Sequence, residues 1–383
     1  MKRDVVVVGA GIVGAAVASA LARGGHAVRV LERRDPGSAV SGGSLACIGA
    51  HMIDEDELPA LRWACDAWAA FAHDAGRDME YRRCGQIRFL AHASERAVAT
   101  HWVELERRAG LQTALLEPDD VRALEPALTG PIVAATWAPE SVVVNPFLAV
   151  RAFVNDARAH GATFRANAPV SGIDVAHDRV TGVRVGDERI ACDAVVLAGG
   201  PWTARTARAA GVELPIVPRK AQCLATVARP ATIRTVVGAC KADGGVDAGY
   251  TQIQQTESGQ ILFNTVLAGG TEASASGGLE APPEIDRAFL RDSVATLLRL
   301  FPSLREVELL RSWVRYEAVT PDDRFLIGRT GIDGLLVAAG DGGTGFTRAP
   351  AIGRAIADVL DETPSPFRTD LYDPMRFASP TIA

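Results

Sequence analysis

The stretch from Asp4 to Gly14, DVVVVGAGIVG, constrains the fold of this chain more than any other. Its four consecutive valines are typical of a strand that is buried on both faces of a sheet. Three glycines follow in the spacing G-x-G-x-x-G, at Gly9, Gly11 and Gly14. In such a unit the first glycine allows a tight turn, the second lets a pyrophosphate approach the backbone, and the third lets helix and strand pack closely. The stretch therefore predicts a dinucleotide-binding βαβ unit.

The residues after these glycines favour the same interpretation. We expect an alanine-rich helix over 12–22, because a Gly-Gly pair follows it as a stop signal. A second strand over 27–31 ends at Glu32, where a carboxylate can accept hydrogen bonds from both ribose hydroxyls of a nucleotide. Glu32 would repel the 2′-phosphate of NADP, although Arg33 and Arg34 offset this slightly. These residues alone leave NAD and FAD open, as well as a βαβ unit whose glycines serve packing only.

Length, charge and cysteine usage narrow the class of protein. A chain of 383 residues is too long for one ordinary core, so we expect two domains. The net charge of −6 argues against nucleic acid as a partner. The six cysteines contain no C-x-x-C pair, which fits reduced thiols and predicts no metal site. We expect a cytoplasmic chain with no membrane span and no signal peptide, since no apolar run is long enough and the first strand starts at once.

The junction of a buried strand with a glycine-rich turn occurs twice more. A strand over 194–197 ends in AGGPWT, and a strand over 335–338 ends in AAGDGGTGFTRAPAIG, after which a helix is expected over 347–360. Turns at this edge of an α/β sheet are where ligands bind. Three such junctions suggest a cofactor that is long enough to reach all of them, as FAD is.

Periodicity predicts the remaining elements. The expected helices are 58–75, 95–109, 147–159 and 285–300, and the expected strands are 85–90, 169–175, 180–185, 188–191, 222–227, 249–254, 260–265 and 306–317. The small residues from Ser41 to Ala50 either let the backbone approach a cofactor or form a flexible connector.

In these motifs the sequence resembles flavoprotein oxidoreductases of the D-amino-acid oxidase type, which include glycine oxidase, sarcosine oxidase and the small subunits of opine and D-hydroxyproline dehydrogenases. The resemblance covers essentially the whole chain. It rests on VVVVGAGIVG with Glu32, VVLAGGPW, RSWVRYEAVTPDDRFLIG and AAGDGGTGFTRAPAIG. It implies a bilobal α/β fold with a Rossmann-like FAD-binding domain and a substrate domain that carries an antiparallel sheet over the flavin. The expected segments are 1–85, 140–220 and 318–383 for the first domain, and 86–139 and 221–317 for the second.

The resemblance also implies which residues hold FAD. Gly9, Gly11 and Gly14 would form the pyrophosphate loop, and Glu32 would bind the ribose. The other implied cofactor-binding residues are Arg33, Ser41, Gly43, Ser44, Val170, Ala198, Gly199, Trp202, Gly343, Thr344, Gly345 and Phe346. The helix N-terminus beside the last four would stabilise negative charge on the reduced flavin. No cysteine or histidine aligns with the family's attachment positions, so we expect FAD to be bound noncovalently.

Enzymes of this type oxidise an amine by hydride transfer to flavin N5, and water hydrolyses the resulting imine. The family often holds a substrate carboxylate with an arginine in a G-L-R-P pattern, where this chain has Glu317. A glutamate would repel a carboxylate. We therefore expect glycine and small D-amino acids to be poor substrates and a bulkier secondary amine to be better. Glu317 would meet a cationic amine, or else it is a surface strand residue.

Other candidate catalytic residues come from the same resemblance. Tyr250 is similar to a strand tyrosine that faces the flavin, with a core tyrosine as the alternative. His51 lies near the place where sarcosine oxidases carry a carboxylate-binding arginine, with a helix-face histidine as the alternative. Arg315, Arg324 and Arg348 are further candidate anchors for an anion.

Three functions are compatible with these patterns. The chain could be an FAD-dependent oxidase or dehydrogenase acting on a small-molecule amine or amino-acid-like substrate. It could be a flavin-binding subunit that works only in a hetero-oligomer with an iron–sulfur or electron-accepting partner. It could also be an NAD-dependent dehydrogenase that uses only the first glycine junction.

Overall fold

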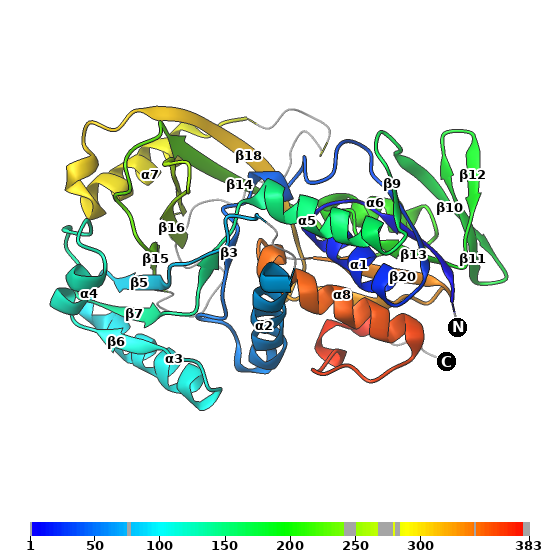
Figure 1. Ribbon diagram of the computed structural model, residues 1–383, viewed down its shortest axis with the longest axis horizontal. Coiled ribbons are helices and arrows are strands. Elements are labelled where there is room, and N and C mark those ends of the chain that lie inside the picture. Colours follow the sequence, from blue (N-terminus) through cyan, green and yellow to red (C-terminus); the bar gives the residue numbers. More distant parts are fainter. Residues whose placement is uncertain are drawn as a thin grey trace.

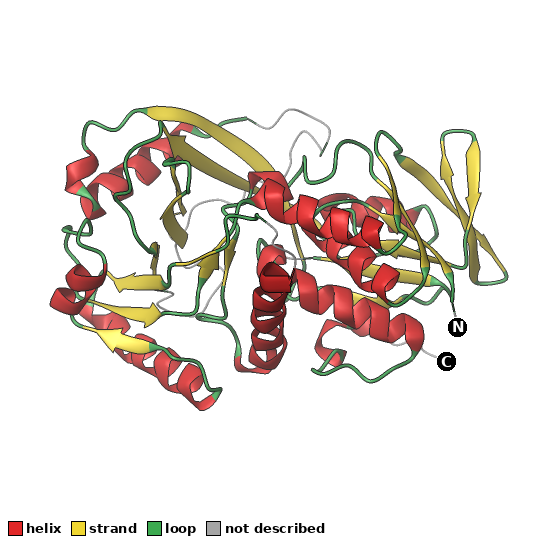
Figure 2. Cartoon of the chain, in the orientation of Figure 1, coloured by secondary structure: helices red, strands yellow, loops and turns green. Residues whose placement is uncertain are grey.

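The computed structural model describes residues 2–74, 78–240, 250–266, 279, 284–340 and 342–377. Two bodies lie beside each other along the long axis of the molecule (Figure 1). One is built on a six-stranded, mainly parallel sheet covered by helices, and the other on an eight-stranded, mainly antiparallel sheet. Figure 2 shows the helices gathered on the first body and at the outer side of the second.

The six-stranded sheet has the strand order β19-β20-β13-β1-β2-β9. Its strands are β1 (Asp4–Val8), β2 (Ala27–Leu31), β9 (Thr163–Arg165), β13 (Ala194–Leu197), β19 (Leu326–Arg329) and β20 (Leu335–Ala339). β1 pairs in parallel with both β2 and β13, and Val5, Val6 and Val7 are 0% exposed. The valine run is thus a central strand, as predicted, and the carboxyl ends of β1, β13 and β20 meet at one edge of the sheet.

Helices pack closely around this sheet because the contacting residues are small. The helices are α1 (Ile12–Arg23), α2 (Leu58–Asp74), α5 (Pro146–Ala159), α6 (Thr203–Arg208) and α8 (Gly345–Asp361). A Cβ on Gly14 would lie 2.1 Å from the Gly9 carbonyl oxygen, and one on Gly353 would lie 2.7 Å from the Ala16 carbonyl oxygen. These glycines therefore set how closely α1 approaches β1 and α8.

The second body carries the sheet order β18-β14-β17-β16-β15-β5-β7-β6. The strands are β5 (Gln86–Leu90), β6 (Ala114–Leu116), β7 (Ala134–Ala138), β14 (Val217–Thr226), β15 (Val236–Ala239), β16 (Tyr250–Gln255), β17 (Ile261–Val266) and β18 (Leu309–Val319). The helices α3 (Arg96–Arg108), α4 (Pro118–Leu124) and α7 (Arg287–Leu300) accompany them. Ile87, Ile253 and Phe263 point into an apolar core that includes residues of α4 and α7.

Two small sheets complete the fold. One is β10 (Val170–Ala176), β11 (Arg179–Val185) and β12 (Glu188–Ala191), and the other is β3 (Cys47–Ile48), β4 (Arg82–Arg83) and β8 (Val142–Val143). Among the elements of the described chain, β3, β4, β6, β7, β8, β9, β15, β19 and α4 were not predicted from the sequence. Most of them are too short to show a period.

The long strands β14 and β18 pair from Val217↔Val319 to Thr226↔Leu309 and connect the two bodies at the top of Figure 1. The proposed domain boundaries at 220/221 and 317/318 fall inside these strands. The division into two domains at those positions stays a proposal. No helix in the described part of the chain combines the length and apolar character needed to cross a membrane.

Candidate cofactor and substrate site

A cleft lies at the carboxyl edge of the parallel sheet, where the first two glycine junctions meet. Of the residues predicted to hold a cofactor, nine line it: Gly9, Gly11, Glu32, Arg33, Ser41, Val170, Ala198, Gly199 and Trp202. The segment 37–41 and residues 338–339 complete its wall. The cleft therefore collects residues that are up to about 330 positions apart in the sequence, between Val8 and Ala339.

Gly9 makes the turn from β1 into the cleft. Its φ is 106°, and a Cβ there would lie 2.6 Å from the carbonyl oxygen of Ala198 on the neighbouring junction. Only glycine fits that position, on both grounds. Gly14 does not line the cleft, because it packs against Gly9 from inside α1.

The N-terminus of α1 points its backbone donors toward the cleft. Gly11 caps the helix without a side chain, the first turn carries no acidic residue, and Ile12 N–H donates to Ser41 Oγ at 2.9 Å. A helix N-terminus carries a partial positive charge that favours an anion. The Ser38 Oγ, on the same wall, is buried, and no described residue forms a hydrogen bond with it. An unpartnered hydroxyl beside a helix N-terminus fits the pyrophosphate of FAD.

Backbone donors hold Glu32 at the other end of the cleft. Its Oε2 accepts from Ala10 N–H at 2.8 Å and its Oε1 from Arg34 N–H at 2.9 Å. The guanidinium carbon of Arg33 lies 3.8 Å from the centre of a Trp202 ring, so the two side chains are in contact in the wall of the cleft. The carboxylate is thus fixed in the place where the sequence predicts a ribose.

The remaining predicted cofactor residues do not line this cleft, and of these Gly43 and Gly343 lie against side chains of β18. Thr344 precedes the first residue of α8, Gly345, and the backbone oxygen of Phe346 accepts from Trp68 Nε1 at 2.8 Å. The Gly43 carbonyl accepts from Trp313 Nε1 at 2.9 Å, and Ser44 Oγ accepts from Ala46 N–H at 3.0 Å. α8 begins at Gly345, and not at residue 347 as predicted.

Glu317 is neither a surface residue nor an unpaired anion. Arg219 donates to its Oε2 at 3.2 and 3.0 Å and also to the Gly342 carbonyl at 3.0 Å. Glu317 is half-buried against Gly343, where an added Cβ would lie 2.6 Å from Glu317 Oε1. Arg219 also lies 3.9 Å from Asp323 Oδ1, so it is shared between two carboxylates. Its pairing with Glu317 reduces the repulsion that this glutamate would exert on a substrate carboxylate. The sequence interpretation overlooked this partner on β14.

Two of the candidate anion anchors are used inside the protein. Arg315 Nε donates to the Ala39 carbonyl at 3.0 Å, so this side chain holds the turn that leads into Ser41. Arg348 forms a buried ion pair with Glu57 at 2.8 Å and also donates to Thr344 Oγ1. Both guanidinium groups position the segments that approach the predicted flavin site.

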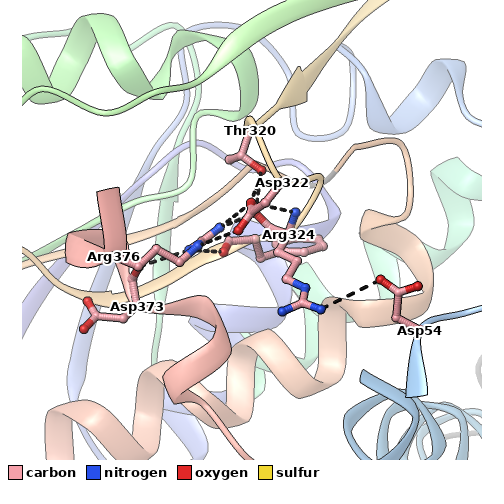
Figure 3. Close-up of polar contacts among 7 residues, drawn as sticks. Asp54, Thr320, Asp322, Arg324, Asp373 and Arg376 are labelled. Carbon is pink, nitrogen blue, oxygen red and sulfur yellow. Dashed lines mark hydrogen bonds and ion pairs between the residues drawn. The ribbon is translucent and has the colours of Figure 1, made fainter. Parts of the chain in front are cut away.

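The third candidate, Arg324, does not line the cleft. Its Nη2 lies 3.9 Å from Asp54 (Figure 3) and 3.8 Å from Asp56. The neighbouring Asp322 accepts from Arg376 at 2.9 and 2.8 Å, which fastens the 320–324 turn to the C-terminal segment. Arg324 therefore belongs to the ion pairs that hold this turn.

His51 is buried in a hydrogen-bonded group. Its Nδ1 lies 3.1 Å from both oxygens of Glu106, and its Nε2 lies 2.8 Å from Thr136 Oγ1. The side chains of His51 and Glu106 are both 0% exposed. Both ring nitrogens are thus already engaged, which leaves none for a substrate carboxylate, and His51 is not on a helix face either.

Tyr250 lies on the face of the eight-stranded sheet that meets the loop 41–45. The same face carries Gln254, whose Nε2 donates to the Leu45 carbonyl at 2.6 Å. The Tyr250 hydroxyl donates to Gln252, and burial raises the pKa of Tyr250 far above its usual value. A neutral tyrosine next to the loop 41–45 suits the predicted substrate site, and its catalytic role stays a prediction.

Sequence reasoning missed three residues of this region: Ser38, Arg219 and Arg88. Arg88 is 8% exposed, and its guanidinium carbon lies 6.0 Å from the centre of the Tyr250 ring. It is the single charged residue in the strand QIRFL, and a charge in an otherwise apolar strand is a signal that could have identified it. Nothing local in the sequence marks Ser38 or Arg219.

The chain matches known proteins over nearly its whole length. The family model "FAD dependent oxidoreductase" (DAO) matches residues 4–359. A D-amino acid dehydrogenase of Paramagnetospirillum magneticum is 26% identical over 98% of this chain and 99% of that protein. The sarcosine oxidase subunit beta of Rhizobium meliloti is 25% identical over 97% of this chain and 88% of that subunit. The crystal structure of L-proline dehydrogenase from P. horikoshii superposes with a TM-score of 0.87 at 27% identity, over 98% of each chain.

Proposed function

Because this chain belongs to the DAO family of FAD-dependent oxidoreductases, we propose that it oxidises a C–N bond of an amine or amino-acid-like substrate, such as a D-amino acid, a secondary amine or an opine. Membership of this family decides for FAD over NAD, a choice that the glycine motif alone leaves open. FAD supplies the hydride acceptor, and hydrolysis of the resulting imine would complete the reaction.

The chain's own residues bind and orient the cofactor in this proposal. The donors at the N-terminus of α1 and Ser38 would hold the pyrophosphate, and Glu32 would accept from the ribose. Val170 would flank the adenine through its backbone. The α8 N-terminus, from Gly343 to Phe346, would stabilise negative charge at the other end of the cofactor.

The observation that carries the proposal is the contact between the polar face of the eight-stranded sheet and the loop 41–45. Trp313 on β18 and Gln254 on β16 bond the loop 41–45 at Gly43 and Leu45. Ser41 of the same loop lines the cleft. A substrate on this face would therefore lie next to the cofactor, with Tyr250 beside it, and the sheet would exclude water from the far side.

The proposal is tested by cofactor analysis and anaerobic reduction. We expect the purified protein to be yellow and to release FAD on denaturation. A panel of D-amino acids, N-methyl amino acids and opines should contain at least one compound that bleaches the visible flavin absorbance without oxygen. Colourless protein that does not take up added FAD would contradict the proposal.

A second candidate function is that of a flavin-binding subunit in a hetero-oligomer. Its support is the similarity to a protein that is itself named as a subunit, the sarcosine oxidase subunit beta. Oxygen consumption by the isolated chain with the best substrate would favour an independent oxidase. Bleaching of the flavin without oxygen turnover, but with turnover by an artificial electron acceptor, would favour a dehydrogenase or such a subunit.

A further inference from the structure

One row of residues across the eight-stranded sheet is polar on the face that meets the loop 41–45. The register of the strands aligns Trp313, Cys223, Asn264, Gln252, Gly238, Arg88 and Thr136. Trp313 bonds the loop directly, which fixes the side of the sheet that this row occupies. The opposite face carries the apolar core, so the polar row is a property of the substrate side alone.

Arg88 in this row is a buried cation with unused hydrogen-bonding capacity. It is 8% exposed, and its Nε has no hydrogen-bond partner among the residues that the structure describes. Nη1 reaches the Ala239 carbonyl only at 3.5 Å, and no described carboxylate forms an ion pair with this arginine. Burying a cation without a counter-ion is costly, so such an arginine is expected where an anion binds.

Gly238 makes room for the Arg88 side chain on the substrate face. A Cβ on Gly238 would lie 2.9 Å from Arg88 Nη1 and 3.2 Å from Arg88 Cδ. The side chain therefore runs across β15 toward β16, where the guanidinium carbon lies 6.0 Å from the centre of the Tyr250 ring. This direction brings the charge toward Gln252 and Tyr250.

A second unpartnered group lies on the other side of Gln252. Asn264 pairs with Gln252 in the strand register, and its Oδ1 is buried without a hydrogen-bond partner in the described part of the chain. The row thus offers a cationic donor and a neutral acceptor with Gln252 between them. A ligand that carries both a carboxylate and an N–H group is complementary to this pair.

We propose that Arg88 binds the carboxylate of the substrate, and that the substrate is accordingly an amino acid with a free carboxylate rather than a simple amine. This inference rests on the proposed function, because it assigns a role within the same site. A guanidinium can pair with a carboxylate through two parallel hydrogen bonds. Arg88 on β5 would thereby supply the charge that the sequence lacks at Glu317 on β18.

The test measures binding of unreactive carboxylates to the FAD-containing protein by calorimetry. The probes are benzoate and 2-furoate, and benzamide serves as the uncharged match. We expect the wild type to bind at least one carboxylate more tightly than benzamide. Arg88→Met should weaken the affinity for that carboxylate about tenfold to a hundredfold, the range of a charge-assisted hydrogen bond, and leave the affinity for benzamide unchanged.

A control variant is available at Arg299 of α7, on the apolar side of the same sheet. The guanidinium carbon of Arg299 lies 5.6 Å from the centre of the Phe89 ring. Phe89 follows Arg88 in the sequence, so its side chain lies on the opposite face of the sheet. Arg299→Met should keep the wild-type affinity for the carboxylate. Arg88→Lys keeps the positive charge but lacks the paired N–H donors of a guanidinium. Its affinity for the carboxylate should therefore lie between those of the wild type and Arg88→Met.

Thermal unfolding separates a binding role from a structural one. Because no described carboxylate pairs with Arg88, Arg88→Met should leave the unfolding midpoint unchanged or raise it, with FAD content intact. Unchanged carboxylate affinity in Arg88→Met, with or without a lower midpoint, would overturn the proposal. Failure of the wild type to bind either carboxylate would overturn it too. The proposed function fails on a different result, the absence of FAD or of flavin reduction by any amine.

Discussion

Glu32 is a cleft residue whose side chain is held in place by backbone hydrogen bonds. Backbone N–H groups of Ala10 and Arg34 hold one carboxylate oxygen each, so little side-chain freedom would be lost if a ribose binds there as proposed. The half-buried carboxylate keeps further lone pairs for the cleft, since each oxygen can accept more than one hydrogen bond.

We expect Glu32→Ala to weaken FAD binding far more than it weakens the fold. Hydrogen bonds to a charged group contribute about 1.5–3 kcal/mol each, so loss of the ribose contacts should cost a few kcal/mol of binding free energy. The measurement is FAD retained after dilution and gel filtration. Asp35→Ala, an exposed acid on the same connection, is the control. Wild-type FAD retention in Glu32→Ala would refute the role of this carboxylate.

For single residues, the sequence predicted positions in the cleft better than it predicted side-chain contacts. Glu32 and the glycines of the first junction lie in a local motif, so both their position and their neighbours could be predicted. Glu317 and His51 could not be interpreted in this way, because their partners Arg219 and Glu106 are 98 and 55 positions away. Arg88 was overlooked because its significance depends on Gly238 and Tyr250, which only the sheet brings near it.

Among the elements, α8 depends on contacts that tie its first turn to distant segments. Arg348 donates to Thr344 at the start of the helix and pairs with Glu57, which precedes α2. Trp68 of α2 bonds the Phe346 carbonyl. These contacts fix the helix N-terminus where the proposal puts the flavin end of the cofactor.

We expect Arg348→Met to be strongly destabilising, because it leaves Glu57 buried without its partner. Breaking one side of a buried ion pair costs roughly 3–5 kcal/mol, whereas replacing both sides is often nearly neutral. The double variant Glu57→Leu with Arg348→Met should therefore recover much of the loss. Urea unfolding of the single and double variants measures this, and a double variant no more stable than Arg348→Met would contradict the pairing.

Element length decided which parts of the fold could be predicted. The helices α1, α2, α3, α5 and α7 and the strand β1 carry clear periodicity or capping signals, and they lie close to the predicted bounds. The strands of the β3-β8-β4 sheet have two residues each and pair across long stretches of chain, such as Cys47 with Val143. No local pattern marks strands of that kind, because the pairing partner alone makes them strands.

At the scale of the whole molecule, the cleft is lined by segments that are far apart in the sequence. Its lining comes from residues 8–41, 169–206 and 338–339, and β14 and β18 connect this body to the eight-stranded sheet. A cofactor in the cleft would contact all of these segments at once. It would therefore stabilise the native arrangement and have little affinity for the unfolded chain.

We expect removal of FAD to lower the midpoint of thermal unfolding, and added FAD to restore it. Ligand that binds only the native state adds about 2.7 kcal/mol of stability at a free concentration of 100 times its dissociation constant. Scanning calorimetry of the holoprotein, the apoprotein and the reconstituted protein measures the shift. Glu32→Ala should recover less of it at the same FAD concentration, because its dissociation constant is higher. Equal midpoints for the apoprotein and holoprotein would mean that FAD does not tie these segments together, and the cleft would then lose its assigned occupant.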